Sequence, residues 1–72
     1  MAEHRFCFVC FKGEGRTTEI DELFVNGKRS PRFEYAFQML DAFAEEGFKL
    51  IEHSVGQKGM NFMVHYFTFR KD

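Results

Sequence analysis

The feature that most constrains the fold of this chain is its phenylalanine content, eleven residues in 72, with no tryptophan and a single proline. A domain of this length buries only about 60–65% of the surface that its unfolded chain exposes, so its core is thin. The rings fall on both faces of nearly every strand-like segment, and one small core cannot hold them all. We therefore expect the chain to be a subunit of a homo-oligomer in which a partner covers some of these rings.

Length and composition predict one small globular domain spanning residues 1–72, with 44% hydrophobic and 29% charged residues. The net charge of −1 argues against duplex nucleic acid as a partner, because wrapping a duplex requires many phosphate contacts. No apolar run approaches the ~20 residues of a membrane span. The first residues lack the basic and apolar blocks of a secretory signal, so we expect a cytoplasmic protein with no membrane partner.

Period-2 patterns predict strands over four segments: Glu3–Lys12, Thr17–Val25, Phe48–Val55 and Met60–Lys71. The first is apolar at almost every position, with Phe6, Phe8 and Cys10 on one face and Cys7, Val9 and Phe11 on the other. Such a strand is typically covered on both faces. Cys7 and Cys10 have the spacing of a redox or zinc motif, but on a strand they point to opposite faces, so we expect two structural thiols. The alternative requires a loop or helix start in this segment.

Ser30-Pro31 favours a helix start, because serine caps free amides and proline is well placed at the first helical position. The helix is expected from Pro31 to about Glu46, ending at Gly47 with a left-handed cap. The stripe expected to pack on the sheet is Phe33, Phe37, Leu40 and Ala44, widened by Ala36 and Phe43. Tyr35, Met39 and Ala42 then face either solvent or a neighbouring subunit. These elements predict an α+β fold with a three- to four-stranded antiparallel sheet and one helix on one face, in the order β-β-α-β-β.

A hairpin loop is expected at Gly56-Gln57-Lys58-Gly59, and its simplest register sets Val55 opposite Met60 and His53 opposite Phe62. The apolar residues predicted to share the second sheet face are Phe48, Leu50, Met63, Phe67 and Phe69, together with Glu52 and His65. One helix cannot cover both faces. We therefore predict an oligomer interface that contains Phe67, Phe69, Met63 and Met39.

Two runs in the second half of the chain, mainly over residues 34–71, carry a resemblance. They are Glu46-Gly47-Phe48-Lys49-Leu50, which closes the helix, and Tyr66-Phe67-Thr68-Phe69-Arg70, an aromatic strand with a basic end. In these runs the chain resembles the small bacterial and phage domains grouped as domain of unknown function 4177, with phenylalanine where that family more often has tryptophan. The segment from Thr17 to Arg29 departs most from the pattern. The resemblance implies a fold and a bacterial or phage source, and it implies no activity.

Basic residues gather in Lys28-Arg29-Ser30-Pro31-Arg32, next to the predicted start of the helix. Because helix N-termini favour negative charge, Arg29 and Arg32 are the predicted anion ligands, with help from Arg16 and Tyr35. A solvated basic loop is the alternative. Residues 13–18 also combine glycines, an arginine and hydroxyls, but a plain hairpin turn explains them more simply.

The histidines give little support for catalysis or metal binding. In the expected hairpin His53 and His65 emerge on opposite faces, which disfavours a shared metal, whereas Glu52 and His65 approach each other as an acid/base pair. No nucleophile or phosphate loop accompanies that pair, so we predict no enzyme and no cofactor. The preferred function is a homo-oligomeric binder of a phosphorylated or nucleotide-like small molecule at subunit interfaces. The alternatives are a protein-interaction or inhibitor module and, last, a small enzyme that uses Glu52 and His65.

Overall fold

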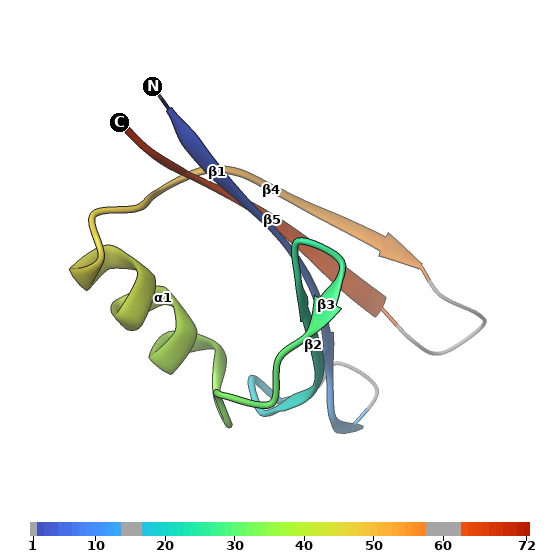
Figure 1. Ribbon diagram of the computed structural model, residues 1–72. Coiled ribbons are helices and arrows are strands. Elements are labelled where there is room, and N and C mark those ends of the chain that lie inside the picture. The colour runs from blue at the N-terminus through green and yellow to red at the C-terminus, as the bar shows by residue number, and fades with distance from the viewer. Residues whose placement is uncertain (1, 14–16, 58–62) are drawn as a thin grey trace.

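The computed structural model describes residues 2–13, 17–57 and 63–72. In this part of the chain an antiparallel sheet has one helix on one of its sides (Figure 1). The elements are β1 (Glu3–Phe11), β2 (Ile20–Val25), β3 (Lys28–Arg29), α1 (Ala36–Glu45), β4 (Lys49–Gln57) and β5 (Met63–Lys71). The five strands lie in the spatial order β3-β2-β1-β5-β4. The α+β class with one helix on an antiparallel sheet is confirmed, but the predicted strand count and order omit one strand.

The additional strand is β3, where the sequence predicts a basic loop. Asn26 and Gly27 both have positive φ angles, 52° and 82°, which suit a two-residue hairpin turn. The turn folds β3 back along β2, so that Arg29 lies opposite Phe24. The Asn26 side chain also accepts a 2.8 Å hydrogen bond from the Phe6 amide, which fixes the turn against β1.

The helix begins at Ala36 and not at Pro31, because the segment before it is held by sheet-like hydrogen bonds. The Ile20 amide donates to the carbonyl of Glu34 at 2.7 Å, and the Ala36 amide donates to the carbonyl of Thr18 at 3.1 Å. The side-chain oxygen of Gln38 accepts 3.0 Å hydrogen bonds from the amides of Glu34 and Tyr35. The predicted helix end is confirmed, since Gly47 follows the last turn with φ 93°.

The core lies between α1 and the sheet face turned toward it, which we call the inner face. The strands contribute Cys7, Val9, Phe11, Ile20, Leu23, Phe67 and Phe69, and α1 contributes Ala36, Met39 and Phe43, with Phe48 following it. The buried helix stripe therefore differs from the predicted one. Met39 is fully buried, while Phe37 is 57% exposed and stacks on Tyr35 outside the core.

Arg5 closes the core at the C-terminal end of α1. Its guanidinium donates two 2.9 Å hydrogen bonds to the Glu46 carboxylate and lies 4.2 Å from the Phe48 ring centre and 4.7 Å from that of Phe43. These contacts lower the pKa of Glu46, mainly through the hydrogen bonds, and raise the pKa of Arg5. A cation over two rings adds stability beyond the ion pair itself.

The β4–β5 pairing differs from the simplest hairpin. Val55 lies opposite His65 and His53 lies opposite Phe67, with a bulge between Leu50 and Glu52. From Glu52 to Gln57 the partner of each β4 residue is thus five positions further along the chain than predicted, an odd shift that exchanges the side chains sharing each face. Residues 58–62, which include the second half of the predicted loop, lie outside the described residues. No helix in the described part of the chain has the length and apolar character that crossing a membrane requires.

Candidate functional site

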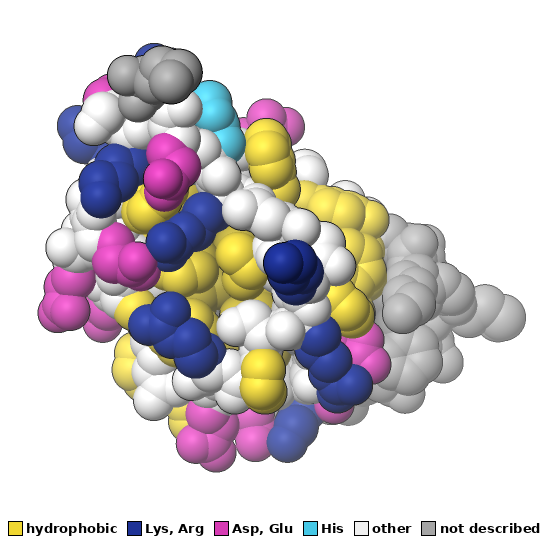
Figure 2. Space-filling model, in the orientation of Figure 1, with side chains coloured by type: hydrophobic (Ala, Val, Ile, Leu, Met, Phe, Trp, Pro, Cys, Tyr) yellow, Lys and Arg dark blue, Asp and Glu magenta, His cyan; other side chains and the backbone are white. Residues whose placement is uncertain are grey.

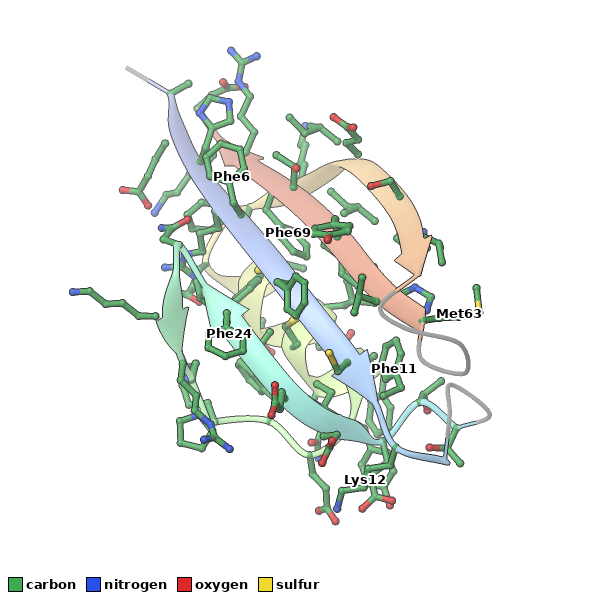
Figure 3. All side chains as sticks on the ribbon, turned by 90° about the vertical axis from the view of Figure 1, so that its right-hand side faces the viewer. Phe6, Phe11, Lys12, Phe24, Met63 and Phe69 are labelled. Atoms are coloured by element: carbon green, nitrogen blue, oxygen red, sulfur yellow. The ribbon has the colours of Figure 1, made fainter. Side chains whose placement is uncertain are left out.

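The sheet surface turned away from α1, which we call the outer face, is rich in aromatic residues (Figure 3). Its side chains are Phe6, Phe8 and Cys10 of β1, Phe24 of β2, and Val64, Tyr66 and Thr68 of β5. Phe8 is the centre of the group, because it meets Phe24 at 5.9 Å and Tyr66 at 5.3 Å between ring centres, both edge to face. Phe6 is 59% exposed and Tyr66 is 44% exposed. Such a contiguous aromatic surface is typical of an interaction site.

The neighbouring glycine helps to fix the Tyr66 ring on this face. A Cβ atom at Gly56 would lie 3.3 Å from a carbon of the Tyr66 ring, so the ring rests over the bare backbone of β4. The same Cβ would lie 3.5 Å from Val64, which is buried on this side of the sheet. A larger residue at position 56 would therefore displace the ring. Packing against Gly56 thus limits the positions open to the Tyr66 ring.

Charged side chains surround the aromatic group, with opposite signs at different margins. At the end where β1 begins, Lys49 lies opposite Arg70, and Arg70 opposite His4. Glu22 lies at the other end, opposite Cys10. Arg29 stands at the β3 margin opposite Phe24, and Glu52 at the β4 margin opposite Thr68. In Figure 2 a continuous hydrophobic area lies on the right-hand side of the described surface, where Figure 1 places the side of the sheet away from α1.

The predicted anion ligands that the structure describes have different surroundings. Arg29 lies at the edge of the outer face, whereas the Arg32 guanidinium sits 4.9 Å from the Phe33 ring centre and adds to the positive charge near Glu46. Tyr35 precedes α1 and stacks on Phe37. Arg16 lies outside the described residues. Since α1 starts at Ala36, Arg29 and Arg32 do not stand beside its first turn as expected, and anion binding by these residues stays a prediction.

The predicted interface residues are also placed differently. Phe67, Phe69 and Met39 belong to the core beneath α1, with Phe69 only 2% exposed, so they are not available to a partner of the folded chain. Met63 is exposed but lies on the inner face, near the β4 edge. The outer face, by contrast, carries Phe6, Phe8, Phe24 and Tyr66, of which Phe6 and Tyr66 are exposed. The alternation in β1 already groups Phe6 with Phe8, but it does not say which face the helix covers.

The predicted placement of His53, His65 and Glu52 on the two sheet faces is wrong. His53 and His65 share the inner face, where Nε2 of His53 and Nδ1 of His65 are 3.0 Å apart. Burial lowers the pKa of His65 below its usual 6.5, and the neighbouring His53 lowers it further. Glu52 lies opposite Thr68 and therefore points to the outer face, so it does not pair with His65. The acid/base pair expected from the sequence does not form.

Cys7 and Cys10 are cysteines outside any disulfide and lie on opposite faces of β1, as predicted. Cys7 lies in the core, and its burial raises its pKa to about 11. Cys10 lies half-buried on the outer face. The two thiols therefore lie in different environments. The reactivity of Cys10 toward an alkylating reagent can be used to measure how accessible the outer face is.

The comparisons with known proteins add no family. No protein-family model matches the chain, and neither a curated protein nor a solved structure does so. The resemblance to domain of unknown function 4177 stays a prediction.

Proposed function

We propose that this chain is a non-enzymatic subunit of a homo-oligomer in which the outer faces of two copies pack against each other. The observation that carries the proposal is the exposed aromatic group on a sheet face opposite the helix, above all Phe6 and Tyr66. Sheets pack face to face about 10 Å apart with interdigitated side chains, and aromatic side chains supply much of the energy of such contacts.

A second copy is the favoured occupant because Arg29 and Glu52, which stand at opposite margins of the outer face, complement each other about a two-fold axis. An axis parallel to β1 lays the β3 margin of one copy over the β4 margin of the other, as isologous packing requires. Arg29 of one copy then lies near Glu52 of the partner subunit, one cross-strand row away, and the contact occurs twice. Opposite charges at the rim favour this register.

The size of the outer face sets the expected affinity. Five strands span four gaps of about 4.8 Å, and four cross-strand rows span three gaps of about 7 Å, which gives a surface of roughly 19 by 21 Å, or about 400 Å² per copy. Two such surfaces bury about 800 Å², below the size of most stable interfaces. We therefore expect a dimer that dissociates at low concentration.

The proposed ligand is a phosphorylated or nucleotide-like small molecule at the rim of this interface. Arg29 supports it, because its guanidinium stands on the same face as the Phe24 ring directly across the β2–β3 pair. A guanidinium beside an aromatic ring is suited to a phosphate joined to a stacking group. The second candidate function is a protein-interaction module, in which a different protein covers the same aromatic group.

Light scattering across a concentration series tests the assembly, since the weight-average mass should rise from one chain toward two. Melting curves with a panel of cyclic and linear nucleotides test the ligand, because a compound that binds only the folded state raises the melting temperature. The matched variants are Arg29→Ala and Arg32→Ala, and only the first should remove the shift. A monomer at every concentration would contradict the assembly, and a shift that survives Arg29→Ala would contradict the rim site.

A further inference from the structure

His53 and His65 form a pair of converging nitrogen donors on the inner face, beside the outer edge of the sheet. Nε2 of His53 and Nδ1 of His65 are 3.0 Å apart, the ring planes are within 11° of parallel and the ring centres are 5.2 Å apart. The rings thus meet at their edges, with the two nitrogens facing each other. One ring donates the proton of this hydrogen bond and the other accepts it, as set by their tautomers.

Aromatic side chains hold both imidazoles in this arrangement. The His53 ring lies parallel to the Phe67 ring, with 4.5 Å between centres and 5° between planes. The Phe11 ring meets His65 edge to face at 4.8 Å. Phe11 and Phe67 belong to the core, so they limit the rotation of the imidazoles from beneath. The His53 side chain remains exposed to solvent.

We propose that His53 and His65 bind a transition-metal ion of the class that prefers imidazole, such as Zn²⁺ or Cu²⁺. Two nitrogens on one tetrahedral ion with metal–nitrogen bonds of about 2.0–2.1 Å stand about 3.3–3.4 Å apart, so the pair needs to open by a few tenths of an ångström. Each imidazole also needs to turn by about 35°, so that its lone pair points at the ion and not at the other nitrogen. The ion replaces the shared proton. The donating ring shifts that proton to its other nitrogen, after which Nε2 of His53 and Nδ1 of His65 both carry lone pairs toward the ion.

The ligand set of the proposed site comes from two neighbouring strands, with Nε2 of His53 on β4 and Nδ1 of His65 on β5 3.0 Å apart. Within the described residues, no group of three or more His, Cys, Asp or Glu side chains gathers. The chain thus supplies two histidine ligands, and water fills the other positions of an open site. The site lies on the inner face, so its occupancy does not depend on the proposed outer-face dimer.

The first experiment adds substoichiometric Cu²⁺, a paramagnetic ion, to the full chain and follows the imidazole proton resonances by NMR. His4 is the internal control, because it lies on the outer face against Phe6. We expect selective broadening of the His53 and His65 signals, with the His4 signals unchanged at the same ratio. Equal broadening of all three histidines, or none, overturns the proposal.

Calorimetric titration with Zn²⁺ supplies the second readout, with Mg²⁺ as the hard-cation control. One ion per chain should bind, His53→Gln and His65→Gln should each weaken binding at least about tenfold, and His4→Gln should leave it unchanged. Circular dichroism of each metal-free variant checks that it folds. Wild-type protein that takes up no Zn²⁺, or binding that survives in both His53→Gln and His65→Gln, contradicts the site.

Discussion

Truncation of Phe6 to alanine should dissociate the proposed dimer, whereas the same truncation of Phe37 should not. The two side chains are almost equally exposed in the single chain, at 59% and 57%. Phe6 lies on the outer face of β1, and Phe37 lies on α1, on the opposite side of the sheet. The pair therefore separates an effect on the outer face from a general effect of losing a surface ring.

The magnitude follows from the area that a partner would cover. A phenylalanine that is 59% exposed offers about 120 Å², since aromatic side chains bury roughly 150–250 Å² in full. At about 25 cal/mol per Å² this is ~3 kcal/mol per copy. A two-fold interface contains the residue twice, so the upper limit is ~6 kcal/mol, or about 10⁴ in the dissociation constant. Because area converts incompletely into affinity, we expect a loss of at least about a hundredfold.

Sedimentation equilibrium over a wide concentration range measures this loss, and urea denaturation of both variants under monomeric conditions measures their stability. The two truncations should cost similar stability, because their exposures match. A wild-type chain that stays monomeric, equal dissociation constants for wild type and Phe6→Ala, or an equal loss in Phe37→Ala would each refute the outer-face assembly.

Three further results are expected. Alkylation of native protein should modify Cys10 and spare Cys7, because burial raises the pKa of Cys7 to about 11. Cys10 should become protected as the protein concentration rises and the proposed dimer forms. Modification of Cys7 before Cys10 would contradict the fold. The ion pair with Arg5 lowers the pKa of Glu46 below its usual 4.5. The stability that the ion pair adds is therefore fully present above pH 4.5, and it is lost as the pH falls through the lowered pKa of Glu46 in the folded state. Glu46→Gln should therefore flatten the acid limb of a stability profile measured by urea denaturation, and an unchanged limb would show that the pair adds no stability. Gly47→Ala should cost about 1–2 kcal/mol, because φ is 93° there and only the flexible Lys71 side chain is near; unchanged stability in urea would contradict the left-handed cap.

The sequence predicts the alternation within β1 correctly, but it cannot say which face the helix covers. Both faces of that strand are apolar, so either one is a physically acceptable core. The helix has the same ambiguity, because Phe37 and Met39 belong to different apolar stripes about 160° apart on its surface. The structure buries Met39 and leaves Phe37 exposed. Because both β1 and α1 have two apolar faces, the faces that form the core are decided only when the helix packs on the sheet. A local sequence pattern does not contain this information.

The histidine pair was missed because the register of a hairpin depends on its loop and on bulges. A glycine-flanked loop at residues 56–59 is the shortest solution, but β4 continues to Gln57 and contains a bulge before Glu52. An odd shift in the pairing moved His53 and His65 onto one face. The helix start was misplaced for a related reason, since hydrogen bonds from Ile20 and to Thr18 hold the segment that Ser30-Pro31 would otherwise have begun. In both cases hydrogen bonds between segments distant in the sequence determined the structure, although the local sequence pattern favoured another one.

The short helix explains why apolar surface remains on two separate parts of this chain. Ten helical residues span about 15 Å, whereas the longest strands, of nine residues, extend about 30 Å and the sheet is about 20 Å wide. The helix therefore leaves part of its own face open near β4, where Val55 and Met63 surround the histidine pair, as well as the whole outer face. The outer face carries four aromatic rings, with Phe24 and Tyr66 in contact with Phe8, whereas the open corner carries two imidazoles with converging nitrogens. The two surfaces differ in chemistry accordingly. The outer face is suited to the large apolar partner that we propose, and the histidine pair is suited to the proposed metal ion, whose binding would leave the proposed dimer unchanged.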